Sequence, residues 1–256
     1  MPLSAIVIID ALSWGRGHMA HITLVMIPGL VSDARVWKPL ADVLAEKHPV
    51  HNANVQRDET IEAMATRLLQ EVDGNIIAIG HSMGGRVAME MAHQAPDRIR
   101  ALVLSNTGHN AKQPGEEAKR QAKIDLGYTD LGQLAAQWVP PMLAPARSAD
   151  AAIVADLTEM VVGIGAEVHE RQIRALMARP DAGAYLPSIA CPILLLTGAQ
   201  DGWSPEAQHR EIAERAPDTE LHVIEGAGHF LPMEQTEKTV ETVLDWMERR
   251  WEDIHD

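Results

Sequence analysis

Short apolar runs alternate with segments of helical periodicity along most of the chain. The runs occupy residues 24–27, 75–80, 101–104, 193–196 and 221–224, with a weaker one at 50–55. Runs that are apolar throughout, rather than at every second position, are typical of parallel strands buried on both faces. The alternation therefore predicts the α/β class, with a mostly parallel, doubly wound sheet covered by helices on both sides.

Between these runs, apolar residues recur at helical spacing. The spacing predicts helices over residues 36–47, 61–69, 82–95 and 240–247. Gly74 stops the second of these helices, and Pro96 ends the third because proline cannot continue a helix. Residues 75–106 are therefore expected to form one strand-helix-strand unit.

The alternation stops between residues 108 and 187. This stretch has helical patterns and proline-rich joints such as Pro140-Pro141, but no convincing strand. We expect a helical lid here, inserted into an α/β core formed by residues 21–107 and 188–256. A chain of 256 residues suits one domain with elaborations of this kind.

Residues 1–20 leave two interpretations open. Gly17-His18-Met19 resembles the scar of an expression vector, which would make this stretch a tag or an N-terminal extension. Residues 6–9 could instead form a native first strand. No Lys or Arg precedes this apolar run and Asp10 interrupts it, so we predict no export signal.

Composition limits the partners of the protein. Asp and Glu outnumber Lys and Arg by 36 to 22, giving a formal charge of −14, and no basic run is present. This balance argues against DNA, RNA or an anionic membrane as a partner, and favours a small, neutral, ester-like substrate. The composition leaves open whether the protein forms a homodimer.

Two further features concern the compartment. The chain has one cysteine, Cys191, so it cannot form an intramolecular disulfide. In addition, no apolar stretch approaches the roughly 18 residues needed to span a bilayer. Together these features favour a soluble, cytoplasmic protein.

The motif Gly-x-Ser-x-Gly occurs at residues 80–84, between the strongest predicted strand and a clear helix. In that context a tight turn raises the Ser82 hydroxyl to the carboxyl end of the sheet, at a helix N-terminus. A serine hydroxyl is a poor nucleophile at neutral pH unless a base, oriented by a third group, removes its proton. The sequence should therefore supply an acid and a histidine further along.

Both groups follow predicted strands. Asp201 lies in the loop after the run at 193–196, and His229 lies in the loop after the run at 221–224. Asp218 and Glu225 are competing acids, but the first precedes the last strand and the second ends it. We therefore favour the order Ser82, Asp201, His229, which is known for this motif.

With these residues in place, the sequence resembles the α/β-hydrolase superfamily over residues 21–250. The specific matches are residues 80–85, 198–201 and 226–229. The resemblance implies the α/β-hydrolase fold with a helical lid inserted after the sixth strand, and chemistry that needs neither a metal nor a cofactor. It also implies that Ser82 is the nucleophile, His229 the general base and then acid, and Asp201 the group that orients the imidazole.

The resemblance further implies an oxyanion hole made of two backbone N–H groups. Met83, the residue after the nucleophile, supplies one. Leu30 supplies the other, from the loop after the first predicted strand, where Pro28 stands in place of the family's common histidine. Proline removes only its own N–H, so Leu30 can still donate.

Five residues are candidate substrate contacts. Arg86 follows Ser82 by one helical turn and could reach a substrate carboxylate, or could form a structural ion pair instead. The expected lid supplies Trp138 and Met142, whereas Trp203 and Phe230 lie next to triad residues. Each of these could equally be ordinary packing or could shield the triad from water.

The sequence therefore predicts a serine hydrolase that cleaves a small ester, thioester or lactone through an acyl-enzyme. A triad-dependent lyase or carbon–carbon bond hydrolase is the first alternative, because residues 82–86 match a string of the menaquinone-pathway synthase. Arg120, Arg171 and Arg174 could hold its polyanionic substrate. A non-enzymatic ligand receptor of the same fold is the second alternative.

Overall fold

The six predicted apolar runs form one sheet of parallel strands in the order β2-β1-β3-β4-β5-β6. The computed structural model describes residues 22–255, so the expectations for residues 1–20 lie outside the described residues. The strands are β1 (Ile22–Ile27), β2 (Val50–Asn52), β3 (Asn75–His81), β4 (Ile99–Ser105), β5 (Ile193–Gly198) and β6 (Thr219–Ile224). This arrangement confirms the predicted α/β class.

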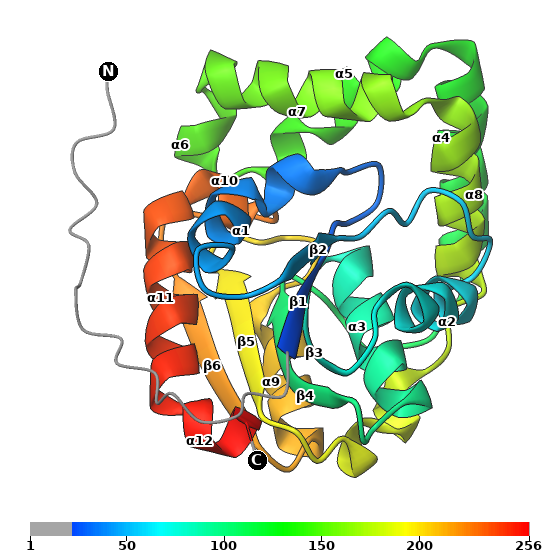
Figure 1. Cartoon of the computed structure of the whole chain (residues 1–256). Helices are drawn as coiled ribbons and strands as arrows, with labels where there is room; N and C mark the ends of the chain where they lie inside the picture. The colour runs from blue at the N-terminus through cyan, green and yellow to red at the C-terminus, as the bar shows by residue number, and fades with distance from the viewer. Residues whose placement is uncertain (1–21, 256) are drawn as a thin grey trace.

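Helices cover both faces of the sheet, as Figure 1 shows. One face carries α1 (Lys38–Leu44), α11 (Thr236–Arg249) and α12 (Trp251–His255). The other carries α2 (Ile61–Glu71), α3 (Met83–Gln94) and α9 (Glu206–Arg215). The helix expected over 36–47 is divided into a 3-10 turn, η1 (Ala34–Val36), and α1, because Pro39 suits the first turn of a helix.

Side chains of the inner strands alternate between two hydrophobic clusters. In β1, for example, Leu24 and Met26 pack into the cluster below α1 and α11, whereas Val25 and Ile27 pack into the cluster below α2 and α3. All four are at most 1% exposed. Burial on both faces is the physical reason that these runs are apolar at every position.

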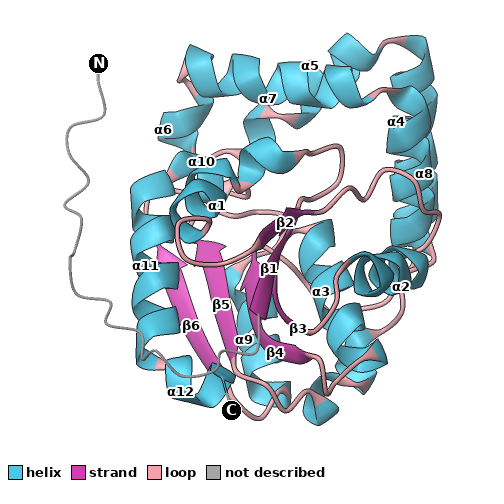
Figure 2. Ribbon diagram, viewed as in Figure 1, coloured by secondary structure: helices cyan, strands magenta, loops and turns pink. Residues whose placement is uncertain are grey.

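The stretch between β4 and β5 contains helices and 3-10 turns but no strand, as predicted. We call residues 116–188 the helical segment. It comprises α4 (Glu116–Thr129), α5 (Leu131–Trp138), η2 (Pro140–Met142), α6 (Pro145–Ser148), α7 (Ala151–Ile164), α8 (Ala166–Met177), η3 (Ala182–Ala184) and η4 (Leu186–Ser188). In Figures 1 and 2, α5 and α7 lie across the carboxyl ends of the strands, while α4 and α8 run down beside α2 and α3.

One detail of the expected topology is wrong. The helical segment does not follow the sixth strand; within the described residues it follows β4, the fourth. The reason is that only four stretches between residues 22 and 105 are extended and paired in the sheet. The strand order also reverses between β1 and β3, since β2 lies on the other side of β1. In open parallel sheets, ligands bind at the carboxyl ends of the strands around such a reversal.

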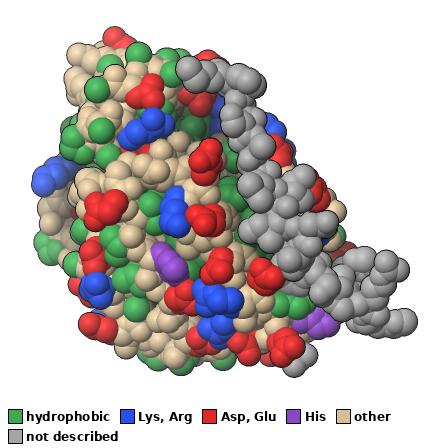
Figure 3. All heavy atoms as spheres, turned by 90° about the vertical axis from the view of Figure 1, so that its left-hand side faces the viewer, with side chains coloured by type: hydrophobic (Ala, Val, Ile, Leu, Met, Phe, Trp, Pro, Cys, Tyr) green, Lys and Arg blue, Asp and Glu red, His purple; other side chains and the backbone are tan. Residues whose placement is uncertain are grey.

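Charges of both signs are interspersed on the face that carries α11 (Figure 3). Arg249 of α11 pairs with Glu220 of β6, and Arg250 pairs with Asp218. In residues 22–255, no helix combines the length and the apolar character needed to cross a bilayer.

Candidate active site

Ser82 lies at the sharp turn between β3 and α3. Its φ of 53° is in the left-handed region, which non-glycine residues seldom adopt and which marks strained functional turns. The turn closes so tightly that a Cβ on Gly80 would come within 2.3 Å of the Gly84 carbonyl oxygen. This close approach requires glycine before the serine, and Gly84 is required because a Cβ there would lie 2.3 Å from the Ile27 carbonyl oxygen.

The structure brings the three predicted triad residues together. Ser82 Oγ lies 2.8 Å from His229 Nε2, and His229 Nδ1 lies 2.9 Å from Asp201 Oδ2. The three residues come from the carboxyl ends of β3, β6 and β5, which the parallel sheet places at one edge. The two rejected acids lie elsewhere: Asp218 pairs with Arg250, and Glu225 accepts a hydrogen bond from Gln200.

Asp201 is buried and fully hydrogen-bonded. Its Oδ1 accepts from the backbone N–H groups of Trp203 and Ser204, at 2.8 and 2.9 Å, and its Oδ2 accepts from Asn106 Nδ2 at 2.9 Å. Burial by itself would raise the pKa of Asp201, but the His229 ring and these donors hold it well below its usual range. Asp201 is therefore ionised at neutral pH and can orient the imidazole.

The loop that carries His229 is held from two sides. The backbone N–H of His229 donates to the Met142 carbonyl at 2.6 Å, and the His229 carbonyl accepts from His81 Nε2 at 2.8 Å. Burial and the neighbouring His229 lower the pKa of His81 to about 3, so that His81 is neutral and donates from Nε2.

Glu234 braces the same loop through its carboxylate. It accepts from the backbone N–H groups of Gly228 and Phe230, both at 3.0 Å, and of Ala144 at 2.7 Å. Burial raises the pKa of Glu234, and these donors oppose that shift. Since Ala144 belongs to the helical segment, that segment and the histidine loop share one buried anchor.

The candidate oxyanion donors flank the nucleophile. Met83 begins α3, where an N–H has no partner within the helix, and the Leu30 N–H makes no hydrogen bond within residues 22–255. The loop with Leu30 lies against the turn, because a Cβ on Gly29 would be 3.2 Å from Ser82 Cβ. The next residue, Val31, has a φ of 42° and donates its N–H to Gln172 Oε1 of α8 at 2.8 Å.

The candidate substrate contacts divide by exposure. Trp203 is 43% exposed and its ring centroid lies 6.5 Å from that of His229. Phe230 is buried edge-on against His229, with a centroid distance of 6.1 Å. Trp138 and Met142 are buried in the cluster shared with α1 and α11. Trp203 is thus the candidate that presents an open aromatic surface beside the triad.

Arg86 is engaged within the protein. Its Nη1 donates to the Asn110 carbonyl at 2.9 Å, which ties α3 to the loop after β4. Burial, together with Arg179 and Arg120, lowers the pKa of Arg86 to about 9, which leaves the guanidinium charged at neutral pH. Arg86 thus has a structural contact, with a backbone carbonyl instead of the ion pair given as the alternative, and a substrate contact for Arg86 stays a prediction.

The arginines considered for a polyanionic substrate also have internal partners. Arg120 pairs with Glu116, Arg174 pairs with Glu170, and Arg171 donates to the Gln56 carbonyl. No specific contact in the structure favours the lyase alternative.

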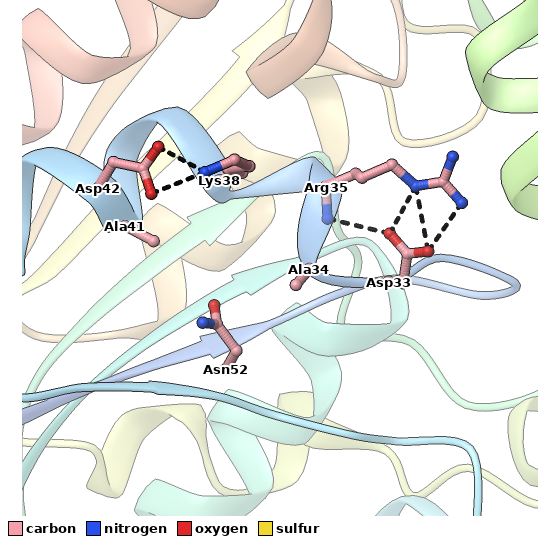
Figure 4. A pocket seen from close by; sticks show the side chains of 7 residues that line it. All are labelled: Asp33, Ala34, Arg35, Lys38, Ala41, Asp42 and Asn52. Atoms are coloured by element: carbon pink, nitrogen blue, oxygen red, sulfur yellow. Dashed lines mark hydrogen bonds and ion pairs between the residues drawn. The ribbon is translucent and has the colours of Figure 1, made fainter.

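A pocket on the other side of β1 is distinct from the triad. It is lined by Asp33, Ala34, Arg35, Lys38, Ala41, Asp42 and Asn52. Figure 4 shows that its charged groups pair with each other, Arg35 with Asp33 and Lys38 with Asp42. Within residues 22–255, no three His, Cys, Asp or Glu side chains are grouped so that they could hold a metal ion.

Sequence reasoning missed the groups that support the triad. Asn106 directly follows β4, and Asp201 and His229 follow β5 and β6 by a few residues. A polar residue just after a predicted strand was therefore a signal in the sequence that could have identified Asn106. Gln172 binds Val31 and Glu234 binds Ala144, both far away in the sequence, so no local pattern marks these two contacts.

The chain is similar to known proteins in sequence and in fold. A family model described as the alpha/beta hydrolase family matches residues 24–242. The chain is 27% identical to a pimeloyl-acyl-carrier protein methyl ester esterase of Aromatoleum aromaticum, over 84% of this chain and 88% of that protein. It is 28% identical to a putative carbamate hydrolase of Stutzerimonas stutzeri, over 91% of this chain and 89% of that protein.

Of two further matches, one is to a much longer protein and the other is to a solved structure. The chain is 27% identical over 93% of its length to the polyketide synthase ThaQ of Burkholderia thailandensis, but spans only 12% of that protein. The solved structure of a thermophilic esterase from Thermogutta terrifontis has a TM-score of 0.82 and 24% identity, over 93% of this chain and 92% of that one. With a family match over most of its length and hydrolases among its relatives, this chain is an enzyme of the hydrolase type and belongs to the alpha/beta hydrolase family.

Proposed function

We propose that the protein is a serine hydrolase that cleaves a small ester, thioester or lactone through an acyl-enzyme. The observation that carries the proposal is the continuous line of hydrogen bonds from Asp201 through His229 to Ser82, at 2.9 and 2.8 Å. Relatives named as an esterase and a carbamate hydrolase support hydrolysis of an acyl derivative.

In the first half of the reaction, Ser82 Oγ attacks the acyl carbon while His229 Nε2 takes its proton. The N–H groups of Leu30 and Met83 hold the negative oxygen that forms, where each such donor contributes about 3 kcal/mol. His229 then protonates the leaving alcohol or thiol, and the acyl group stays on Ser82.

In the second half, water attacks the acyl-enzyme. His229 takes a proton from the water and returns it to Ser82 Oγ as the acid product leaves. Asp201 stays ionised throughout, fixing the proton of the neutral imidazole on Nδ1 and stabilising the imidazolium. We propose that the helical segment is a lid over this site, because α5 and α7 lie across the carboxyl ends of the strands (Figure 1).

The test is turnover of short-chain aryl esters, lactones and thioesters by the wild type and by Ser82→Ala. We expect Ser82→Ala to lower kcat by about a thousandfold or more, and a serine-directed fluorophosphonate to label the wild type only. Ser188→Ala, a change at an exposed serine of η4, is the matched control and should retain wild-type kcat. Turnover that survives in Ser82→Ala, or labelling of that variant, would refute the proposal.

A further inference from the structure

Lys123 connects the helical segment to the catalytic histidine. It lies on α4, and its Nζ is 4.4 Å from the centroid of the Trp203 ring. That ring is in turn 6.5 Å from the His229 ring, and the backbone N–H of Trp203 donates to the carboxylate of Asp201. A cation is therefore held next to the aromatic surface that adjoins the triad.

The charge of Lys123 is not matched by a carboxylate. Within residues 22–255 no Asp or Glu oxygen lies within 4.0 Å of its Nζ, and the side chain is half-buried. By contrast, the neighbouring Arg120 pairs with Glu116 in the same helix, and Glu116 also pairs with Arg179. The carboxylate of Glu116 is thus already shared by two guanidiniums.

The groups around Lys123 do not compensate its charge. Burial and the nearby Arg120 lower the pKa of Lys123, which agrees with a partly desolvated cation that lacks an anionic partner. His169 of α8 lies close enough that burial and Lys123 together lower its pKa to about 4, so this histidine is neutral at pH 7. Glu170, the carboxylate that opposes this shift of His169, is itself paired with Arg174.

An aromatic ring positions an ammonium group without neutralising it. The ring face attracts the cation through its quadrupole, while the N–H bonds that point away from the ring remain free for an oxygen acceptor. An ammonium held in this way can bind a carboxylate without first breaking an internal ion pair. Charge-assisted hydrogen bonds of this type are about twice as strong as neutral ones.

We propose that Lys123 is the specificity-determining residue of the site, binding a carboxylate of the substrate while Ser82 attacks its acyl carbon. The substrates are then small esters, thioesters or lactones that carry a carboxylate, and Trp203 holds the ammonium in place and contacts their carbon chain. This inference rests on the proposed function and replaces the neutral substrate expected from net charge. Net charge is a weak guide here, because screening over about 8 Å at physiological salt leaves local groups to decide binding.

The experiment compares matched ester pairs that differ in one carboxylate. The acyl-side pair is the para-nitrophenyl monoester of glutaric acid and para-nitrophenyl valerate. The alcohol-side pair is para-carboxyphenyl acetate and phenyl acetate. The quantity measured is the ratio of kcat/KM for the anionic ester to that for the neutral ester. The variants are Lys123→Met and, as a matched loss of one charge on an exposed residue of the same helix, Lys119→Met.

In one of the two pairs, Lys123→Met should lower this ratio by about 10- to 100-fold, the effect of losing one charged hydrogen bond. Lys119→Met should keep it within about twofold of the wild type. A ratio that Lys123→Met changes by less than about threefold in both pairs overturns the inference. Lys123→Gln replaces the Met variant if that one fails to fold. Failure of the proposed function itself would be seen separately, as turnover that persists in Ser82→Ala.

Discussion

Asn106 is one of the groups that hold the Asp201 carboxylate ionised. Its Nδ2 donates to the Asp201 oxygen that also accepts from His229, and to the Gly228 carbonyl at 3.0 Å. Its φ of 51° is in the left-handed region, which Asn and Asp tolerate better than most residues. Asn106 is therefore a positioning residue that links the acid loop to the histidine loop.

We predict that Asn106→Asp moves the acid limb of the pH profile of kcat/KM to higher pH. Two carboxylates would then share one site, and their repulsion raises the pKa at which the pair first takes up a proton. The proposed mechanism needs the triad unprotonated, so activity should be lost at a higher pH than in the wild type. The control is Asn54→Asp, which adds the same charge at an exposed position. An unchanged acid limb in Asn106→Asp would contradict the assigned role.

At the scale of elements, α8 supports the loop that carries Leu30, the proposed oxyanion donor, through Gln172. This side chain is fully buried, accepts from the strained Val31 N–H at 2.8 Å and donates to the Val55 carbonyl at 2.9 Å. It thereby connects the helical segment to the loops after β1 and β2. The position of the Leu30 N–H depends on this connection, because Leu30 directly precedes Val31.

We predict that Gln172→Leu lowers kcat by about tenfold or more with a smaller change in KM. The substitution leaves two backbone groups without partners, at about 1–3 kcal/mol each, and frees the loop that positions an oxyanion donor. Steady-state kinetics and a thermal melt measure both effects. Gln133→Leu, at an exposed position of α5, is the control and should retain activity. Equal kinetics for the two variants would show that α8 does not position the loop.

At the scale of the whole molecule, three buried histidines are neutral parts of the fold. Burial lowers the pKa to about 3 for His81 and to about 4 for His169 and His209. His209 shows the reason: its Nε2 accepts from the Thr107 N–H at 3.1 Å while its Nδ1 donates to the Pro205 carbonyl, which requires the neutral ring.

These histidines predict that the free energy of unfolding decreases as the pH falls from 6.5 to about 4. In that range the unfolded chain binds protons at these rings and the folded chain does not, so protonation favours unfolding. We expect a loss of at least about 2 kcal/mol, measured by urea unfolding at pH 7 and pH 4. His169→Phe should reduce the loss, whereas a change at the half-buried surface residue His222 should not. Equal stability at both pH values would be inconsistent with neutral buried rings.

The success of sequence reasoning depended on how local each signal was. The elbow at Ser82 and the loops with Asp201 and His229 each follow one strand, so strand order alone indicated that they meet. Lys123 and Trp203 meet only because α4 folds back over the loop after β5, and nothing in either segment predicts that contact. Four apolar runs precede residue 108, and they correspond to β1–β4; only the position after a sixth strand, which came from the resemblance, was wrong.

The shared anchor of the histidine loop and the helical segment has a consequence for engineering. Met142 and Ala144 contact residues 228–229 through their backbones and through Glu234. A chimaera that replaces residues 108–187 with the corresponding part of a relative would change more than the helices that lie over the carboxyl ends of the strands. It would also replace the support of His229, the proposed general base, so grafts that keep residues 142–144 should be the ones that remain active.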